Sequence, residues 1–483
     1  MKNKSNALPK ALVWFRRDLR LKDNVCLKEA SDAGLQIIPV FVWNPTEGGK
    51  WAFGEASRWW LNESLRSLIQ DIEQLGGELI LKVGPAELIL PQLATDMGVD
   101  EVFFSKAYDP AGRRTQDKLE SCLQERGMSF QSFNNTLLNE PPTVLNGSGK
   151  PFQVFTPYWK KAKSVIPSQN PSNQKSLLNF AKGGNNKLNL DQTSILPNHD
   201  WYKKFAGKWD ISESAANKLV ERIPEDIVPE YGSRRNIPSI VGTSRLSPYL
   251  AWGLISPRQV LAEIETRGES KATGIDTQYV AEIGWREFSH QLLYHFPRMT
   301  DDPLREKYRQ FPWRKDQEDL RKWQRGQTGY PLVDAGMRQL WETGWMHNRV
   351  RMIVASFLVK HLLIPWQEGA KWFWQTLVDA DLASNSQGWQ WSAGCGADAA
   401  PYFRIFNPFG QGEKFDSAGD YARKWVPEIG DLPNQWIHRP WDAPIHELAS
   451  AKVRLGKDYP MPMVEHKVAR KRALAALAQV KET

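Results

Sequence analysis

Residues with the chemistry of a ligand site cluster in a tryptophan-rich stretch, residues 341–408. The run 347–349 (His-Asn-Arg) follows Gly344, which is a natural C-terminal stop for a helix that begins near Pro331. Apolar residues at helical spacing predict a second helix that starts near Asn348. Because the first N–H groups of a helix have no partner within it, this run can hold an anion or a ligand oxygen.

Two carboxylates follow a third predicted helix, which covers about residues 367–378. Asp379 and Asp381 come at its C-terminal end, where the helix dipole disfavours negative charge. A positive or hydrogen-bonding group is therefore expected to hold them, and Arg351 on the second helix could hold Asp379. This mismatch between charge and helix end indicates a functional site.

Strand-like and helix-like segments alternate in the first part of the chain. Helix-length segments, such as 56–75 and 115–126, separate four short apolar runs, at residues 11–15, 36–43, 78–83 and 101–104. This order predicts a doubly wound parallel sheet, an α/β domain with helices on both faces. No Gly-x-Gly-x-x-Gly follows the first run, so a dinucleotide at that turn is disfavoured.

Length and composition predict two domains and a connecting segment. A chain of 483 residues is too long for one small core. We assign residues 1–140 to the α/β domain. Residues 141–200 are assigned to a linker, because they hold a Ser/Asn/Gln/Lys-rich stretch that includes Gly-Gly-Asn-Asn at 183–186. Helical periodicity over residues 201–483 predicts an all-α second domain.

Positive charge is concentrated in the second part of the chain. Residues 1–140 hold 17 Lys and Arg against 19 Asp and Glu, a net charge of −2, whereas the remainder holds 46 against 36, a net charge of +10. A basic part of this kind suggests a polyanion partner such as nucleic acid, although charge alone equally allows a solvated surface.

Cysteine and hydropathy patterns exclude several classes of protein. Cys26, Cys122 and Cys395 are far apart, so they make no disulfide framework and match no zinc spacing, and we expect no metal. The polar start, residues 1–10, has no apolar signal core, and no run of 18 apolar residues occurs. We expect a monomer of the reducing cytoplasm that does not enter membranes.

Several segments allow both a structural and a functional interpretation. Thr243 and Ser244 precede an apolar helix and could cap it, or they could seat a diphosphate together with Arg245. Glu282 and Arg286 stand at i,i+4 spacing, which allows a weak salt bridge or a carboxyl group that faces a pocket.

Two other segments are interpreted structurally. The run 16–20 (Arg-Arg-Asp-Leu-Arg) is interpreted as a solvated, ion-paired loop. The pair Trp59-Trp60 is interpreted as one indole packed on the sheet and one at the surface.

Several long motifs together resemble the photolyase/cryptochrome family. They are residues 14–20 (Trp-Phe-Arg-Arg-Asp-Leu-Arg), 242–248 (Gly-Thr-Ser-Arg-Leu-Ser-Pro), 344–352 (Gly-Trp-Met-His-Asn-Arg-Val-Arg-Met), 379–385 (Asp-Ala-Asp-Leu-Ala-Ser-Asn), 388–391 (Gly-Trp-Gln-Trp) and 402–408 (Tyr-Phe-Arg-Ile-Phe-Asn-Pro). Motifs of this length, in this order, are far more specific than a short glycine pattern. The resemblance implies an antenna-binding α/β domain followed by a helical domain that binds FAD and DNA.

The resemblance also implies which residues contact FAD. They are Tyr231, Thr243, Ser244, Arg245, Leu246, Ser247, Arg286, Asn348, Arg351, Asp379, Ala380, Asp381 and Asn385. Asn385 matches the residue that faces flavin N5, where an amide suits a reduced, anionic flavin and plant photoreceptors carry aspartate. Trp389, Trp366 and Trp313 match the family's relay for reducing the flavin, although each alone would be interpreted as a core tryptophan.

The substrate implied by the resemblance is a cyclobutane pyrimidine dimer in ultraviolet-damaged DNA. Trp285 and Trp391 match the two indoles that sandwich a thymine dimer, and stacking on aromatic rings is a general way to hold extruded bases. Asn348 and Met352 also match the dimer-repair pattern. The implied reaction is light-driven repair, in which reduced FAD gives an electron to the dimer.

Three charged residues complete the expected substrate site. Glu282 should hydrogen-bond the dimer carbonyls in its protonated form, which apolar burial would favour. Arg235 and Arg349 are expected to contact DNA phosphates.

The antenna chromophore and two alternative functions complete these expectations. Residues 107–110 (Ala-Tyr-Asp-Pro) look closest to the bacterial branch related to plant cryptochromes, which favours methenyltetrahydrofolate over a deazaflavin. One alternative function is a blue-light photoreceptor with the same fold and flavin. The other is a non-catalytic, basic DNA-binding helical protein.

Overall fold

The structure is a computed structural model of the chain, and it describes residues 8–167, 178–181, 188–267, 274–399 and 404–482. Three expectations fall partly outside these residues. They concern the polar start (residues 1–7), the Gly-Asn run of the linker (183–186), and the first two residues of the last motif (402–403).

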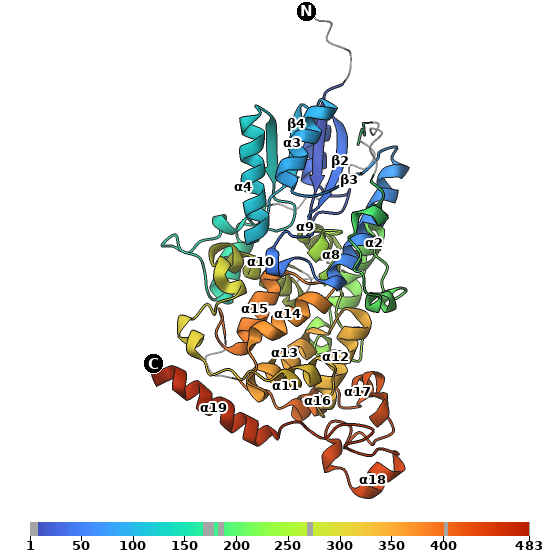
Figure 1. Cartoon of the computed structure of the whole chain (residues 1–483), viewed down its shortest axis with the longest axis vertical. Helices are drawn as coiled ribbons and strands as arrows, with labels where there is room; N and C mark the ends of the chain where they lie inside the picture. Colours follow the sequence, from blue (N-terminus) through green and yellow to red (C-terminus); the bar gives the residue numbers. More distant parts are fainter. Residues whose placement is uncertain (1–7, 168–177, 182–187, 268–273, 400–403, 483) are drawn as a thin grey trace, which may run out of the picture.

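The first part of the chain forms one parallel sheet of five strands in the order β3-β2-β1-β4-β5 (Figure 1). The strands are β1 Lys10–Phe15, β2 Gln36–Trp43, β3 Ile80–Val83, β4 Glu101–Ser105 and β5 Ser129–Phe133. The first four confirm the predicted runs. The edge strand β5 was not predicted, because Ser-Phe-Gln-Ser-Phe is short and only partly apolar.

Helices cover both faces of the sheet, as predicted. Alternate residues of β1 belong to different cores, because successive side chains of a strand point to opposite faces. Ala11, Val13 and Phe15 join the core that includes α1 (Val25–Asp32) and α2 (Glu55–Gln74). The residues between them, Leu12 and Trp14, pack with α3 (Ala86–Met97) and α4 (Pro110–Glu125).

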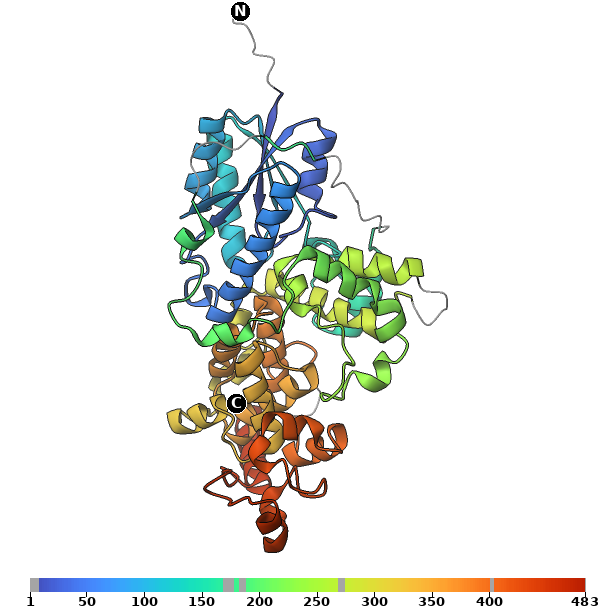
Figure 2. The same ribbon diagram turned by 90° about the vertical axis from the view of Figure 1, so that its right-hand side faces the viewer.

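The second part of the chain is helical, as predicted, and it lies below the sheet in Figures 1 and 2. From Trp201 on, every secondary-structure element among the described residues is a helix, apart from an isolated β-bridge between Leu455 and Tyr459. The α-helices after the sheet are α5 Phe155–Lys163, α6 Glu213–Glu221, α7 Tyr231–Arg234, α8 Ser247–Trp252, α9 Pro257–Arg267, α10 Gln278–His295, α11 Gln317–Gln324, α12 Pro331–Thr343, α13 Asn348–Ser356, α14 Trp366–Thr376, α15 Leu382–Ala393, α16 Pro408–Phe415, α17 Asp420–Trp425, α18 Ile445–Ser450 and α19 His466–Glu482.

The arginine-rich loop after β1 is a contact between the two parts of the chain, so the prediction that it is solvated is wrong for Arg20. The Arg20 side chain is fully buried and donates to the carbonyl oxygens of Gly253 and Asn135 at 3.0 and 2.9 Å. The backbone N–H groups of Leu21 and Lys22 donate to the carboxylate of Glu213 on α6. These hydrogen bonds offset the free-energy cost of burying the Arg20 and Glu213 charges.

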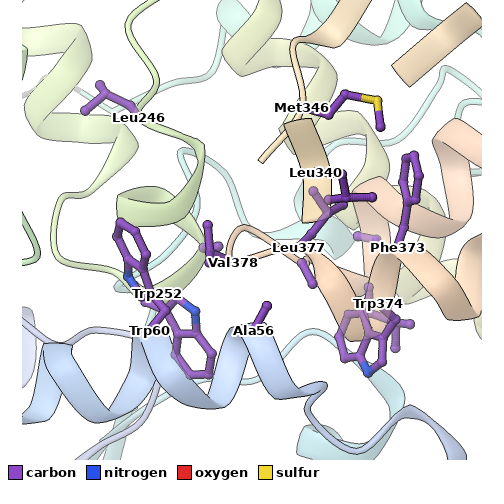
Figure 3. Close-up of a cluster of buried hydrophobic side chains, with 14 of the residues drawn as sticks. Ala56, Trp60, Leu246, Trp252, Leu340, Met346, Phe373, Trp374, Leu377 and Val378 are labelled. Atoms are coloured by element: carbon purple, nitrogen blue, oxygen red, sulfur yellow. The ribbon is translucent and has the colours of Figure 1, made fainter. Parts of the chain in front are cut away.

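The prediction that one indole of the Trp59-Trp60 pair lies at the surface is also wrong. Both are buried, because α2 packs on the sheet with one side and on the helical part with another. Trp60 lies edge-on to Tyr249 of α8, with ring centroids 5.2 Å apart. Figure 3 shows Ala56 and Trp60 on α2 opposite side chains of α8 and of the end of α14.

Candidate functional site

The helix start that was predicted from the 344–349 motif is present. Gly344 ends α12 in the left-handed conformation, with φ 68°, which glycine adopts without strain. His347 is the N-cap of α13, and its Nδ1 accepts from the Arg349 N–H at 3.2 Å. Burial, with Arg351 and Arg245 nearby, lowers the pKa of His347 to about 4. The imidazole is therefore neutral near pH 7, as its acceptor role requires.

Arg351 binds Asp379, the carboxylate that follows α14. This confirms the prediction that a positive group holds Asp379 where the helix dipole disfavours negative charge. The Arg351 guanidinium donates to Asp379 Oδ2 at 2.7 Å and to the Met346 carbonyl oxygen at 2.8 Å. The Asp379 carboxylate is almost fully buried, and its Oδ1 has no hydrogen-bond partner among the described residues. A buried carboxylate oxygen without a partner fits the edge of a ligand that brings a donor, as a flavin ring does.

Asp381 has different partners, although only one residue separates it from Asp379. It is the N-cap of α15 and accepts from the Ser384 N–H at 2.8 Å. Its carboxylate also lies 3.3 Å from His290 and 3.5 Å from Arg17, in the loop after β1. Burial alone would raise the pKa of Asp381, but His290 and Arg17 hold it below its usual range.

The run 243–247 does not cap a helix, so that structural interpretation is wrong. Helix α8 begins at Ser247, and the N-cap residue, Leu246, provides no side-chain hydrogen bond. Ser244 instead accepts from the Tyr279 hydroxyl at 2.9 Å. Arg245 has φ 54°, in the left-handed region that non-glycine residues rarely adopt.

Trp345 joins this run to the Arg351–Asp379 pair. Its indole N–H donates to Ser247 Oγ at 3.3 Å, and the Arg245 guanidinium lies over its ring at 4.8 Å. The Arg351 guanidinium lies 6.0 Å from the same ring. Hydroxyls and two cations therefore gather around one indole, which suits a diphosphate more than an apolar ligand.

Glu282 forms an ion pair with Arg235, and its side chain is 30% exposed. The apolar burial that was expected around Glu282 is therefore not present in the structure. The alternative salt bridge from Glu282 to Arg286 is not formed either. Arg286 donates to the Thr136 carbonyl oxygen at 2.9 Å and to Glu287 at 3.1 Å.

The two tryptophans expected at the substrate lie on helices that pack against each other. Trp285 is on α10 and Trp391 is near the end of α15, and both are partly exposed. On α15, Asn385 donates to the Ala370 carbonyl oxygen at 3.0 Å. One turn on, a Cβ added to Gly388 would meet no atom within 4 Å, so open space lies beside this part of the helix. Asn348 is exposed and Met352 is half-buried on α13.

Arg349 belongs to a group of cations near the start of α13. Its guanidinium donates to Asn236 Oδ1 at 2.6 Å and lies 4.6 Å from the Phe415 ring. Burial, together with the nearby charges of Arg235 and Arg404, lowers the pKa of Arg349. Cations that repel one another at a partly exposed position favour a polyanion.

Among the described residues, no ring contact joins any two of the three tryptophans predicted to form the relay. Trp389 and Trp366 are buried and Trp313 is partly buried. In the described part of the chain, the rings that contact Trp389 are Phe373 at 5.0 Å and Trp323 at 6.1 Å. The relay therefore stays a prediction.

A cavity of about 420 Å³ lies at the carboxyl ends of β1, β2 and β4, between the sheet and the helical part. Ligands of open parallel sheets generally bind at this edge. Its lining combines indoles with cations and several carboxylates and includes Trp43, Trp51, Trp374, Lys106, Arg114 and Asp381.

The sequence interpretation missed Tyr279, His290 and Trp345 as residues of these sites. Trp345 lies within the 344–352 motif, so the neighbouring residues of that motif could have indicated its place in the site. His290 and Tyr279 carry no local signal, because their partners are 35 to more than 90 residues away in the chain.

Comparisons with known proteins cover nearly all of the chain. The family model described as DNA photolyase matches residues 11–174, and the FAD binding domain of DNA photolyase matches residues 279–479. The chain is 44% identical to the deoxyribodipyrimidine photo-lyase of Agrobacterium fabrum, over 98% of each chain. It is 38% identical to cryptochrome-2 of Arabidopsis thaliana, over 98% of this chain and 79% of that protein.

A solved structure has the same fold. The bacterial class III photolyase from Agrobacterium tumefaciens matches with a TM-score of 0.94 and 43% identity, and the match covers 100% of each chain. No helix in the described ranges is long and apolar enough to span a membrane. From the family models and these similarities, we conclude that the chain belongs to the DNA photolyase family and carries its FAD-binding domain.

Proposed function

We propose that this chain repairs cyclobutane pyrimidine dimers in ultraviolet-damaged DNA, in a light-driven reaction that uses reduced FAD. The observation that carries this proposal is the pair of partly exposed indoles, Trp285 and Trp391, on two packed helices, the second of which also holds Asn385. Aromatic faces of this kind suit a base extruded from the duplex. The similarity to a deoxyribodipyrimidine photo-lyase supports the same substrate.

The residues around Trp345 and Asp379 would hold FAD. Ser244, Ser247 and Arg245 would take the diphosphate, and the unpartnered Asp379 Oδ1 would accept from a ring N–H. Asn385 would face the flavin ring with an amide, which can hydrogen-bond but does not release a proton. When bound and reduced, FAD would supply under illumination the electron that splits the dimer, and this electron would then return to the flavin.

DNA would be held by the cations near the start of α13. Arg235, Arg349 and Arg404 would contact phosphates, which positions the duplex without reading its sequence. For Glu282 to donate to a dimer carbonyl, it would have to leave Arg235 and take up a proton. A phosphate that draws Arg235 away would favour both changes.

The cavity at the strand ends would hold the antenna chromophore. Indoles at its wall suit a flat conjugated ring, and Lys106 and Arg114 suit an anionic tail. Both features fit methenyltetrahydrofolate. Its release on gentle denaturation would give an absorption spectrum that distinguishes it from a deazaflavin.

The decisive experiment measures repair directly. Ultraviolet-irradiated oligothymidylate loses absorbance near its maximum, and pre-reduced protein should restore it under blue light but not in darkness. Recovery in darkness, or no recovery in light with a fully reduced flavin, would refute the proposal.

The similarity to cryptochrome-2 of Arabidopsis supports one alternative, a blue-light photoreceptor. In that case the purified protein would bind FAD and respond to light, but it would not split dimers. The same assay therefore separates the two functions.

A further inference from the structure

A second aromatic ring covers one face of Trp285. Phe155, the first residue of α5, stacks on the Trp285 indole with ring centroids 3.9 Å apart and planes 9° apart. This is the shortest centroid separation among the ring pairs of the described residues. A ring stacked this closely leaves only the opposite face of the indole for a base.

Contacts between α5 and α10 fix the position of Phe155. Phe288, which is fully buried, lies edge-on to both rings, with centroids 6.0 Å from Phe155 and 5.9 Å from Trp285. Trp159, one turn along α5, packs over Gly284, where an added Cβ would lie 2.7 Å from the indole. The two helices therefore approach closely beside the Phe155 ring.

A backbone contact ties the same residue to the chain beyond α15. The Asp398 N–H donates to the Gln153 carbonyl oxygen at 3.1 Å. Burial raises the pKa of Asp398, and the nearby Phe155 N–H partly offsets this rise. Asp398 comes seven residues after Trp391. Phe155 therefore contacts the helix of one substrate tryptophan and the segment that follows the other.

We propose that Phe155 is a positioning residue for lesion binding. It supports the back face of Trp285, so that an extruded pyrimidine stacks only on the front face. The Asp398 contact sets the place of this support relative to the end of α15. This inference rests on the proposed function, because it assumes that Trp285 stacks on the dimer.

The substitution Phe155→Leu tests the inference, because it keeps an apolar side chain and removes the ring. Affinity for a duplex with one thymine dimer should fall about threefold to tenfold, and affinity for the undamaged duplex should stay within about a factor of two. Repair per bound dimer by pre-reduced protein at saturating DNA should be unchanged. Phe155→Tyr, which keeps the ring, should behave as wild type.

Phe152→Leu is the matched control. Phe152 lies in the same segment, but its ring is edge-on to Tyr158 at 6.2 Å. This variant should keep the wild-type ratio of damaged to undamaged affinity. Flavin absorbance and the melting temperature report folding of each variant, and Phe155→Met replaces the leucine variant if that one folds poorly.

A double-mutant cycle gives the sharpest result. In a Trp285→Ala background, Phe155→Leu should cause no further loss of dimer affinity, because the ring that it supports is absent. The inference is overturned if the two losses add, if Phe155→Leu binds the dimer as wild type does, or if it weakens both duplexes equally. A wild-type protein with no preference for the dimer would instead refute the proposed function.

Discussion

At the scale of single residues, the Arg351–Asp379 pair shows how unequal burial shapes a site. The Asp379 side chain is 1% exposed, whereas the Arg351 side chain is 24% exposed. A partly solvated cation therefore neutralises a buried anion. We expect Arg351→Met to lower the free energy of unfolding by about 3–5 kcal/mol, because it leaves that anion without its partner.

Urea unfolding of the flavin-free protein measures this change, with Arg351→Lys as the control that keeps the charge. The lysine variant should lose less stability. Equal midpoints for wild type and Arg351→Met would show that Asp379 does not depend on this partner.

His347 makes stability depend on pH. The pKa of the imidazole is about 6.5 in the unfolded chain and about 4 in the folded one. The contribution of His347 to the free energy of unfolding is therefore fully present above pH 6.5 and is lost as the pH falls toward 4. His347→Asn keeps an N-cap acceptor but removes this titration. Between pH 7 and pH 5, wild type should lose about 2 kcal/mol more than the variant.

Chemical unfolding at the two pH values provides the measurement. His446, which is exposed on α18, offers a control as His446→Asn. That control should follow wild type. A variant at His347 with the same pH dependence as wild type would contradict the assignment.

At the scale of elements, helix ends were the most predictable part of the site. Pro331, Gly344 and His347 act through local backbone geometry, so the boundaries of α12 and α13 followed from neighbouring residues. The edge strand β5 was missed because it buries few apolar residues.

The contacts that define the sites were far less predictable. Glu282 pairs with Arg235 from 47 residues away, and Arg20 reaches Gly253 across 233 residues. Such pairs depend on how elements pack, and no local pattern encodes them. The family motifs supplied the residues predicted to bind the flavin, but they did not show that Asp379 and Asp381 have different partners.

The contact between α14 and α15 supports a prediction about flavin reduction. Gly369 on α14 lies against the Trp389 ring, where an added Cβ would lie 2.1 Å from the indole. Gly369→Ala should displace Trp389 and slow photoreduction of oxidised flavin, as Trp366→Phe and Trp313→Phe should if the relay is correct. Repair by pre-reduced Trp366→Phe and Trp313→Phe proteins should be unaffected.

Gly410→Ala is the control for the glycine variant, because its Cβ would meet atoms only at ordinary contact distance, 3.5 Å. Time-resolved absorbance of the flavin gives the photoreduction rates. Unchanged rates in all three relay variants would count against the predicted route.

At the scale of the whole molecule, the net charge of +10 beyond residue 140 should govern DNA affinity. Each phosphate neutralised in a duplex contributes about 0.9 to the slope of log affinity against log salt. Arg349→Ala should therefore weaken damaged and undamaged duplexes alike and flatten that slope by about 1. Binding measured at several salt concentrations gives the slope.

Arg222→Ala removes the same charge from an exposed ion pair with Asp226 and serves as the control. Its slope should equal that of wild type. An unchanged slope for Arg349→Ala would exclude a phosphate contact at this residue.

The buried loop after β1 has a consequence for the integrity of the molecule. Arg20, Leu21 and Lys22 bind atoms that belong to the helical part, and α2 adds an apolar contact with it. A protease cut between α5 and Trp201 should therefore yield two fragments that elute together from a sizing column and separate only in denaturant. Neither fragment would be expected to stay in solution alone, since each would expose surface that the other covers.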